Sequence, residues 1–302
     1  MSDSAVFDVV FASDDRYAPH LAVAIRSLLH WNRGAVRLHV ITAGFAPAIR
    51  DALQSLAERH DAPIRFHVVP DVAFDGLARL SYISKATYYR LMIPEFVEGP
   101  RALYLDCDLV VNASLAPLVQ TDLGHCGLAA VEDPYSLREP FRERLGMREG
   151  ARYFNSGVML MGLDVWRRAG WGEKVSEFVA RRPEAVRYVD QCGLNAVIDG
   201  EWVALAPRWN QQTLMHEWTR DELAGYRTPA EIDEALASPA IVHFTGPSKP
   251  WQADNVHPCR RLYWQHRRNV PFPPHRPPFS ATRLAKLIVP RPLKRWYWAR
   301  QG

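Results

Sequence analysis

Residues 102–111 read ALYLDCDLVV, and this stretch sets both the fold and the candidate site. Eight of its ten residues are apolar, which predicts a buried strand, and the other two are Asp106 and Asp108 in its latter half. Side chains two residues apart point to the same side of a strand, and two carboxylates held together repel each other and are costly to desolvate. The pair therefore predicts either a divalent cation between the carboxylates or a solvated strand end with two ordinary acids.

The residues before this stretch alternate between predicted strands and predicted helices. Strands are expected at 6–12, 36–44, 64–70 and 102–111, and helices at 17–31 and 46–60. The alternation favours a parallel α/β sheet covered on both faces, and the nearly continuous apolar strands agree with that burial. Ligands of such sheets bind at the carboxyl ends of the strands, where the acid pair is expected.

The pattern after residue 127 is less regular. Further strands are expected at 127–133, 153–163 and 240–246, and helices at 164–182 and 190–198. Residues 271–279 read PFPPHRPPF and form a proline-rich break. The sequence therefore predicts one large domain over residues 1–265 and a tail over residues 266–302.

The cysteines and the first residues indicate the compartment. The four cysteines are scattered without a CxxC pair, which indicates free thiols in a reducing environment. The chain begins MSDSAVFDVV, with acids where a secretory signal needs Lys or Arg, and no apolar run reaches the length of a membrane span. We therefore expect a cytoplasmic protein.

The net charge of +4 divides unevenly along the chain. After Asp254 there is no acidic residue, and residues 255–302 contain eleven Arg or Lys. In RLAKLIVPRPLKRWYWARQG (283–302) cations alternate with aliphatic and aromatic residues, which favours peripheral contact with an anionic membrane surface at its inner face. A basic tail that only improves solubility is the alternative. Nucleic-acid binding is not expected, because nothing in the acidic body supports it.

Three other stretches place polar residues in apolar surroundings. FNSGVML (154–160) carries a glycine, which in a strand marks a bulge or a closely approaching ligand. YVDQCGLNAV (188–197) contains Asp190, which is a plausible helix N-cap as well as a candidate site residue. HFTGPSKPW (243–251) offers a histidine that is either an ordinary surface residue or a nitrogen ligand, and a lysine that suits a phosphate.

Six stretches, in order, resemble glycosyltransferase family 8, the retaining group that includes glycogenin and bacterial lipopolysaccharide galactosyl- and glucosyltransferases. They are FASDDRYAPHLAVAIRSLL, ISKATYYRLMIPE, LYLDCDLVV, FNSGVMLM, DQCGLN and HFTGPSKPW, and the likeness covers residues 6 to about 265. The resemblance implies a GT-A fold, which is a Rossmann-like nucleotide-binding mixed sheet flanked by helices, followed here by a basic helical tail. It also implies a UDP-hexose donor, a glycan or glycolipid acceptor, and Mn²⁺ or Mg²⁺ as the cofactor.

The resemblance further implies roles for individual residues. The implied metal ligands are Asp106, Asp108 and His243. The implied nucleotide-binding residues are Ala12, Asp14, Tyr17, Arg90, Gly246 and Lys249. The implied sugar- and acceptor-binding residues are Asp133, Asn155, Ser156, Asp190 and Gln191. Asp190 and Gln191 are also the implied catalytic residues, with the amide of Gln191 steadying the anomeric carbon.

Two other classes share part of this pattern. A phosphohydrolase of the DxD type places DxDxT after its first strand, whereas here the pair follows the fourth predicted strand and Val110 stands where threonine is needed. A non-catalytic relative that only binds nucleotide sugars is the second alternative, and the intact site residues argue against it. Two positions depart from the family pattern. DQC replaces the frequent DQD, so a carboxylate is absent at Cys192, and Arg16 stands where related enzymes often carry a small polar residue.

Overall fold

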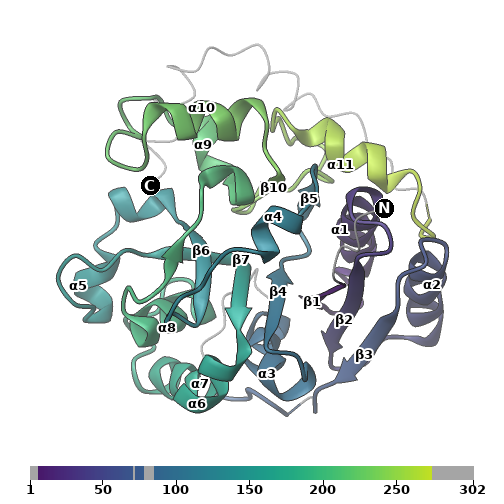
Figure 1. Cartoon of the computed structure of the whole chain (residues 1–302), viewed down its shortest axis with the longest axis horizontal. Helices are drawn as coiled ribbons and strands as arrows, with labels where there is room; N and C mark the ends of the chain where they lie inside the picture. Colours follow the sequence, from purple (N-terminus) through teal and green to yellow (C-terminus); the bar gives the residue numbers. More distant parts are fainter. Residues whose placement is uncertain (1–5, 71, 78–84, 274–302) are drawn as a thin grey trace.

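The computed structural model describes residues 6–70, 72–77 and 85–273, and its central element is a seven-stranded sheet (Figure 1). The strands, in spatial order, are β3 (Ile64–Val68), β2 (Val36–Thr42), β1 (Phe7–Ala12), β4 (Arg101–Leu105), β7 (Phe154–Gly162), β6 (Leu128–Glu132) and β8 (Val203–Ala204). Strands β3, β2, β1 and β4 are parallel, as the alternation predicted, whereas β7 runs antiparallel to both β4 and β6. The sheet is therefore mixed, as the resemblance implied.

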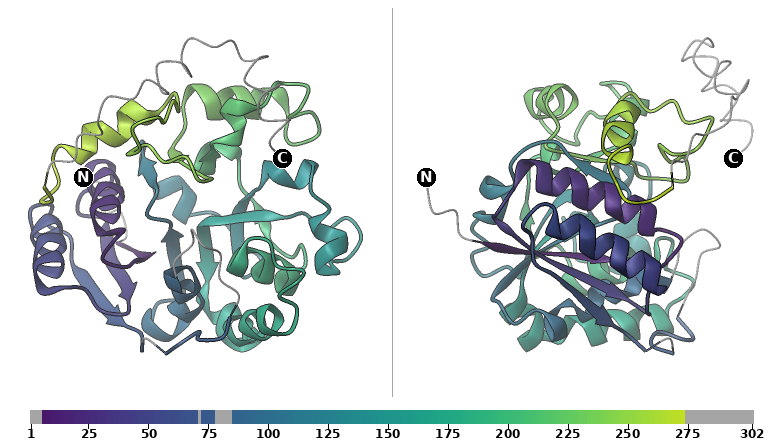
Figure 2. Two further views of the ribbon diagram at one scale, coloured as in Figure 1. Left: turned by 180° about the vertical axis from the view of Figure 1, so that it is seen from behind. Right: turned by 90° about the vertical axis from the view of Figure 1, so that its right-hand side faces the viewer.

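Helices cover both faces of this sheet (Figures 1 and 2). One face carries α1 (Ala18–Trp31) and α2 (Pro47–Glu58). The other carries η1 (Lys85–Met92), α3 (Ile93–Phe96), α6 (Leu163–Ala169), α7 (Trp171–Arg181) and α8 (Val189–Ile198). Along β1, Val9 and Phe11 pack with the first group, and Val10 and Ala12 pack with the second. Burial on both faces explains why these strands are apolar at nearly every position.

The single helix expected at 164–182 is two helices in the structure. Gly170, which has a φ of 62°, ends α6 in the left-handed conformation and lets α7 begin in a new direction. The remaining helices are α4 (Ala116–Val119), η2 (Pro134–Leu137), α5 (Phe141–Leu145), η3 (Pro207–Asn210), α9 (Leu214–Glu217), α10 (Pro229–Ala237) and α11 (Arg260–Arg267).

A second, three-stranded sheet corrects the prediction of one strand over residues 102–111. Strand β4 ends at Leu105, residues 106–108 turn, and β5 (Leu109–Val111) pairs with β10 (Ile241–His243) of the small sheet β5-β10-β9. Strand β9 (Gln211–Gln212) lies parallel to β10. The sequence could not show the break because the segments on both sides of the turn are apolar and buried. The acid pair therefore lies where two sheets join.

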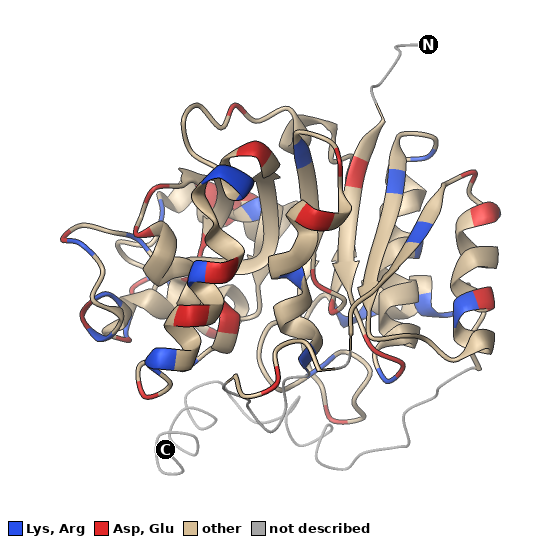
Figure 3. Ribbon diagram, turned by 90° about the horizontal axis from the view of Figure 1, so that it is seen from below, with Lys and Arg blue, Asp and Glu red and all other residues tan. Residues whose placement is uncertain are grey.

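The C-terminal part of the described chain packs on the body. Helix α11 lies beside α1 (Figure 1), and Tyr263 and Val270 belong to the same apolar core as α1. Lys and Arg residues are interspersed with Asp and Glu residues over the helices and loops (Figure 3). Within residues 6–70, 72–77 and 85–273, no helix is long and apolar enough to cross a bilayer. The expected membrane-contacting segment, residues 283–302, lies outside the described residues.

A buried carboxylate ties β1 to β2 far from the acid pair. Asp8 receives hydrogen bonds from Arg37 Nε at 2.5 Å and from His39 Nε2 at 2.9 Å. Burial alone would raise the pKa of Asp8, but these partners lower it to about 2 from a usual value of 3.8. A depressed pKa in the folded state stabilises the protein above about pH 4, and that stability is lost as the pH falls through about 2.

Asp8→Asn should therefore flatten the acid limb of the stability curve. We expect the loss of unfolding free energy between pH 5 and pH 2 to be about 2 kcal/mol smaller in the variant than in the parent, by urea unfolding at each pH. Asp61→Asn is the matched control, because Asp61 pairs with Arg33 at the surface, where both side chains are about 70% exposed. Equal pH slopes for the parent and Asp8→Asn would contradict the prediction.

Candidate active site

One large cleft, with a volume of about 1360 Å³, brings together all of the residues that the resemblance singled out. It opens where β1, β4 and β10 end and where η1 and α8 approach them. The predicted residues that line it are Ala12, Asp14, Tyr17, Arg90, Asp106, Asp108, Asp133, Asn155, Ser156, Asp190, Gln191, His243, Gly246 and Lys249. These residues come from across the sequence, so their meeting in one cleft is a property of the fold.

Two carboxylates and an imidazole converge in the middle of the cleft. His243 Nε2 lies 3.2 Å from Asp108 Oδ1 and 3.7 Å from Asp106 Oδ2. One ligand atom from each of these three residues lies within 4.8 Å of the others. Carboxylate oxygens with one imidazole nitrogen are a donor set that suits Mn²⁺ or Mg²⁺, so the residues fit the implied metal.

Lys249 reaches the same carboxylate from the loop after β10. Its Nζ forms an ion pair with Asp108 Oδ2 and donates a hydrogen bond to the carbonyl oxygen of Phe244 at 2.7 Å. Burial would raise the pKa of Asp108, but the positive charge of Lys249 opposes it most strongly, and that pKa lies well below its usual range. Asp108 is therefore an anion at neutral pH and can serve as a ligand.

Arg90 joins the metal end of the cleft to its sugar end. Its Nη2 lies 3.1 Å from Asp106 Oδ1, and its Nε lies 3.0 Å from Asp190 Oδ2. Burial disfavours the charged guanidinium, but the two carboxylates raise the pKa of Arg90 above its usual value. Burial raises the pKa of Asp190, whereas Arg90 and the hydroxyl of Thr87 act in the opposite direction. Arg90 thus holds two acids at a fixed separation.

A buried cluster of amides lies next to Asp190. Gln191 Oε1 accepts hydrogen bonds from the backbone N–H of Ser156 at 3.0 Å and from Asn155 Nδ2 at 3.2 Å. Gln191 Nε2 and Asn155 Nδ2 both donate to Asp133 Oδ2, at 3.0 Å and 3.3 Å. Burial raises the pKa of Asp133, and the donors from Tyr135, Gln191 and Asn155 oppose that rise. The cluster presents fixed dipoles in surroundings that exclude most water.

The far end of the cleft has aromatic walls. Tyr17 packs edge-on against Trp251 with ring centroids 5.9 Å apart, and His20 stacks on Trp251 at 3.5 Å. The backbone N–H of Tyr17 donates to Asp14 Oδ1 at 3.0 Å, which fixes the loop after β1. Gly246 has a φ of 80°, a conformation that favours glycine and lets the backbone turn closely over the cleft. Flat rings and a close backbone are suited to a nucleotide.

Gly157 provides the space in which the metal-ligand candidates meet. A Cβ at this position would lie 2.2 Å from His243 Cε1 and 2.7 Å from Asp106 Oδ2. Strand β7 bulges here, because Val131 and Ala130 of β6 pair with Asn155 and Met159, which are four residues apart. The glycine in FNSGVML was expected to mark a bulge or a closely approaching ligand, and the structure shows the bulge together with the close approach of two side chains, His243 and Asp106.

Three contributors to the site were not predicted. Tyr104 donates a hydrogen bond to Asp106 Oδ1 at 2.6 Å, and Thr87 donates to Asp190 Oδ1. Both lie inside stretches already singled out. Tyr104 stands two positions from Asp106, so a hydroxyl residue beside a candidate acid was an available signal there, whereas Thr87 is 103 positions from Asp190 and gave no such signal. Asn210, whose Oδ1 lies 2.9 Å from His243 Nδ1, carried no sequence signal.

The reading of Asp190 as a helix N-cap was wrong. Helix α8 begins at Val189 with Tyr188 in the N-cap position, so Asp190 belongs to the first turn. Its carboxylate faces Arg90 and Thr87 across the cleft, and it does not satisfy the helix end in the manner of a cap.

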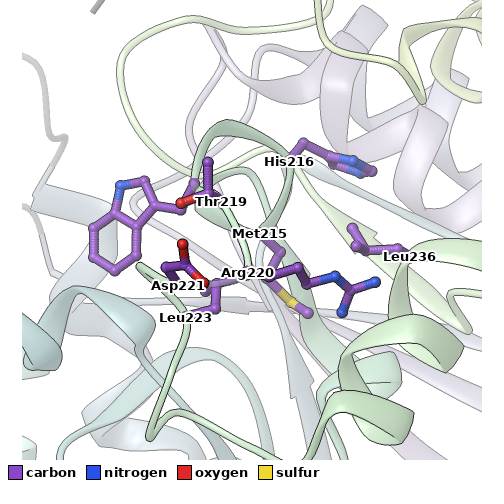
Figure 4. Close-up of a pocket in the computed structure, with 8 residues that line it drawn as sticks. Met215, His216, Thr219, Arg220, Asp221, Leu223 and Leu236 are labelled. Carbon is purple, nitrogen blue, oxygen red and sulfur yellow. The ribbon is translucent and has the colours of Figure 1, made fainter.

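A second cavity and a second cluster lie beside α9, at the border of the large cleft. A cavity of about 460 Å³ is lined by Met215, Thr219 and neighbouring residues (Figure 4), and shares only His216 and Trp218 with the large cleft. His216, His257 and Cys259 also lie close enough to hold a metal. However, His257 Nδ1 accepts the backbone N–H of Cys259 at 3.1 Å, so the neutral ring carries its proton on Nε2 and has no free lone pair for an ion.

The comparisons with known proteins agree with this geometry. The sequence model of Glycosyl transferase family 8 matches residues 8–255. General stress protein A of Bacillus subtilis (strain 168) is 33% identical over 88% of this chain and 94% of its own length. The lipopolysaccharide 1,3-galactosyltransferase of Salmonella typhimurium (strain LT2) is 24% identical over 90% of this chain and 80% of its own.

The fold agrees as well. The crystal structure of the galactosyltransferase LgtC in complex with donor and acceptor sugar analogs superposes with a TM-score of 0.80 at 32% identity. The match covers 89% of this chain and 98% of that one. The chain belongs to glycosyltransferase family 8, and its mixed sheet with flanking helices is the GT-A fold.

Gly157→Ala tests whether the site requires a residue without a Cβ at this position. The new Cβ has to displace His243 or Asp106, so we expect Mn²⁺ affinity to fall about tenfold or more, as measured by the loss of the free-Mn²⁺ EPR signal on titration. Gly162→Ala is the matched control on β7, since its Cβ would lie 3.2 Å from the end of the flexible Leu123 side chain. The same Mn²⁺ affinity in both variants would show that the site tolerates a Cβ.

Proposed function

We propose that this glycosyltransferase moves a hexose, galactose or glucose, from a UDP-sugar to a glycan acceptor with retention of configuration. The acceptor class is lipopolysaccharide or a similar glycan, which agrees with the name of the Salmonella relative. The observation that carries the proposal is the convergence of Asp106, Asp108 and His243 beside Lys249, next to a buried amide cluster in the same cleft. A diphosphate leaving group and a sugar ring need these two environments side by side.

The metal end of the cleft is suited to a departing diphosphate. Asp106, Asp108 and His243 would hold Mn²⁺ or Mg²⁺, which as a Lewis acid neutralises charge that develops on the leaving phosphate oxygen. Lys249 adds a fixed positive charge in the same place. Gly246 lets the loop after β10 approach phosphate oxygens with its backbone. Together these groups would stabilise the transition state by several kcal/mol. In enzymes, the removal of a single electrostatic contact of this kind raises the barrier by a similar amount.

The aromatic end and the loop after β1 suit the nucleoside. Tyr17 supplies a ring against which a uracil can pack. The turn held by Asp14, which follows Ala12, would present backbone groups to the base and ribose. Arg90 links Asp106 to Asp190, so a nucleotide-sugar with its uracil against Tyr17 and its hexose at Asp190 would lie with its diphosphate over Asp106 and Asp108.

The sugar end positions the hexose by ionic and neutral hydrogen bonds. Asp190, paired with Arg90, can accept hydrogen bonds from sugar hydroxyls, and Asn155, Ser156 and Asp133 lie beside it. Gln191 lines this part of the cleft, and its Oε1 could steady positive charge at the anomeric carbon. The donor hydrogen bonds from Ser156 and Asn155 withdraw electron density from that oxygen, which makes it a poor nucleophile. We therefore favour attack from the face of the leaving phosphate over a covalent sugar–enzyme intermediate.

Asp106→Asn combined with Asp108→Asn tests the metal assignment. The amides keep the shape but lose the negative charges, so Mn²⁺-dependent UDP release from a UDP-hexose should fall below detection while the far-UV CD spectrum stays unchanged. Asp122→Asn, at an exposed position, is the control. UDP release by the double variant at the parent rate, or parent activity that persists in EDTA, would contradict the assignment.

A panel of UDP-hexoses tests the donor class in the parent enzyme. Comparing UDP release from each donor separates galactose from glucose, and no turnover of any UDP-hexose would refute the donor class.

The second part of the proposal concerns where the enzyme works. Residues 283–302 hold six Arg or Lys together with Trp296, Tyr297 and Trp298, and each cation near an anionic surface contributes about 1 kcal/mol. Such a segment would hold a cytoplasmic enzyme at the inner face of a membrane, where a lipid-linked glycan acceptor is found.

Deleting residues 283–302 should reduce co-sedimentation with vesicles that contain anionic lipid and leave hydrolysis of a soluble UDP-sugar unchanged. Vesicles of zwitterionic lipid are the control for charge, and raised salt should weaken only the anionic binding. Equal binding of the full chain and the shortened chain to anionic vesicles would defeat the membrane assignment without affecting the transferase assignment.

A further inference from the structure

Asn210 is a fully buried amide that joins the metal-ligand candidates to the sugar end of the cleft. It ends η3, immediately before β9, and β9 lies next to β10, which carries His243. Asn210 Oδ1 lies 2.9 Å from His243 Nδ1. Asn210 Nδ2 donates to Asn155 Oδ1, also at 2.9 Å. The side chain therefore contacts His243 on one side and β7 on the other, and it does not itself line the cleft.

The backbone of β7 fixes the orientation of the two side-chain amides that connect it to His243, those of Asn155 and Asn210. The N–H of Gly157 donates to Asn155 Oδ1 at 3.1 Å, and a backbone N–H cannot exchange its role. Asn155 must therefore present its oxygen here, and Asn210 must turn its NH₂ group toward that oxygen. The carbonyl oxygen of Asn210 then faces His243, so the imidazole must carry its proton on Nδ1.

With the proton on Nδ1, the lone pair on His243 Nε2 faces the two carboxylates. Nε2 and Asp108 Oδ1 are both electron-rich atoms, and they lie 3.2 Å apart. A cation between them makes this arrangement favourable, whereas an imidazole with the opposite tautomer would block the cation with a proton. The orientation of a ligating histidine is set in this way by the hydrogen bond at its other nitrogen.

We infer that Asn210 is a positioning residue, which holds His243 as the Nδ1–H tautomer and thereby presents Nε2 to a divalent cation. Asn155 extends the same chain, because its Nδ2 donates to Gln191 Oε1 at 3.2 Å. The metal end and the sugar end are thus oriented by one set of hydrogen bonds that starts at the backbone of β7. This inference rests on the proposed metal-assisted transfer for its purpose, but the tautomer itself does not depend on a metal.

The first test reads the tautomer in the metal-free full chain. Long-range ¹H–¹⁵N NMR above neutral pH, with the His243 signals assigned by loss in His243→Gln, should show a protonated Nδ1 in the parent. Asn210→Ala should lose this preference and give averaged nitrogen shifts, because the acceptor is gone. An unprotonated Nδ1 in the parent, or an unchanged Nδ1 in Asn210→Ala, would overturn the inference.

The second test measures Mn²⁺ affinity by EPR. Asn210→Ala should weaken binding about 10- to 100-fold, whereas Asn210→Asp keeps an acceptor for Nδ1, although it loses the donor to Asn155, and should bind more tightly than Asn210→Ala. Gln211→Ala is the matched control, since Gln211 is equally buried but its side chain donates to the carbonyl oxygen of Gln212 and does not contact His243. Thermal unfolding of each variant separates loss of fold from loss of binding.

The outcomes distinguish the two proposals. If the parent binds no Mn²⁺ but shows the Nδ1–H tautomer and Asn210→Ala abolishes it, the metal assignment fails and the role of Asn210 stands. If the parent binds Mn²⁺ and Asn210→Ala matches Gln211→Ala in both affinity and tautomer, Asn210 is a structural amide only and the inference is wrong.

Discussion

The cleft depends on holding more negative than positive charge in a place that is largely shielded from water. Asp106, Asp108 and Asp190 are brought together, and among the described residues Arg90 and Lys249 are the Arg or Lys side chains that pair with them. Three carboxylates against two cations leave a negative charge that is costly in a region of low dielectric constant. A bound cation completes the balance, and His243 supplies it with a neutral ligand without adding another negative charge. The rest of the architecture serves to bring these groups together and keep them in place.

Strand β7 does most of this positioning although it carries no charge in the site. Its bulge brings the backbone of residues 156 and 157 against the turn after β4, where the N–H of Asp106 donates to the carbonyl oxygen of Gly157 at 2.8 Å. Its N–H groups orient the amides of Asn155 and Gln191. The absence of a Cβ at Gly157 leaves room for His243. A single buried strand thus sets the spacing of the metal ligands and the direction of the dipoles.

Much of this could be predicted from the sequence, and the misses have physical causes. Strands such as β1 and β4, buried on both faces, read as apolar runs, and Asp106 and Asp108 stand out against that background. The break between β4 and β5 was invisible because apolar character continues across it and the change of sheet is decided by the distant pairing with β10. Asn210 was missed because an amide between two apolar segments looks like any loop residue. Its role comes from a partner 33 positions away.

The same balance of charge explains why the sugar end of the cleft carries amide side chains beside Asp133 in place of further acids. Asp133 is buried, and burial already raises its pKa, so its carboxylate depends on donors from Gln191 and Asn155. A carboxylate in place of the Gln191 amide would remove a donor from Asp133 and place a further acid between Asp133 and Asp190. Fixed amide dipoles avoid that cost and need no reorientation when positive charge develops on the sugar. The cleft therefore concentrates ionic groups where a diphosphate leaves and uses neutral, oriented groups where the sugar is held.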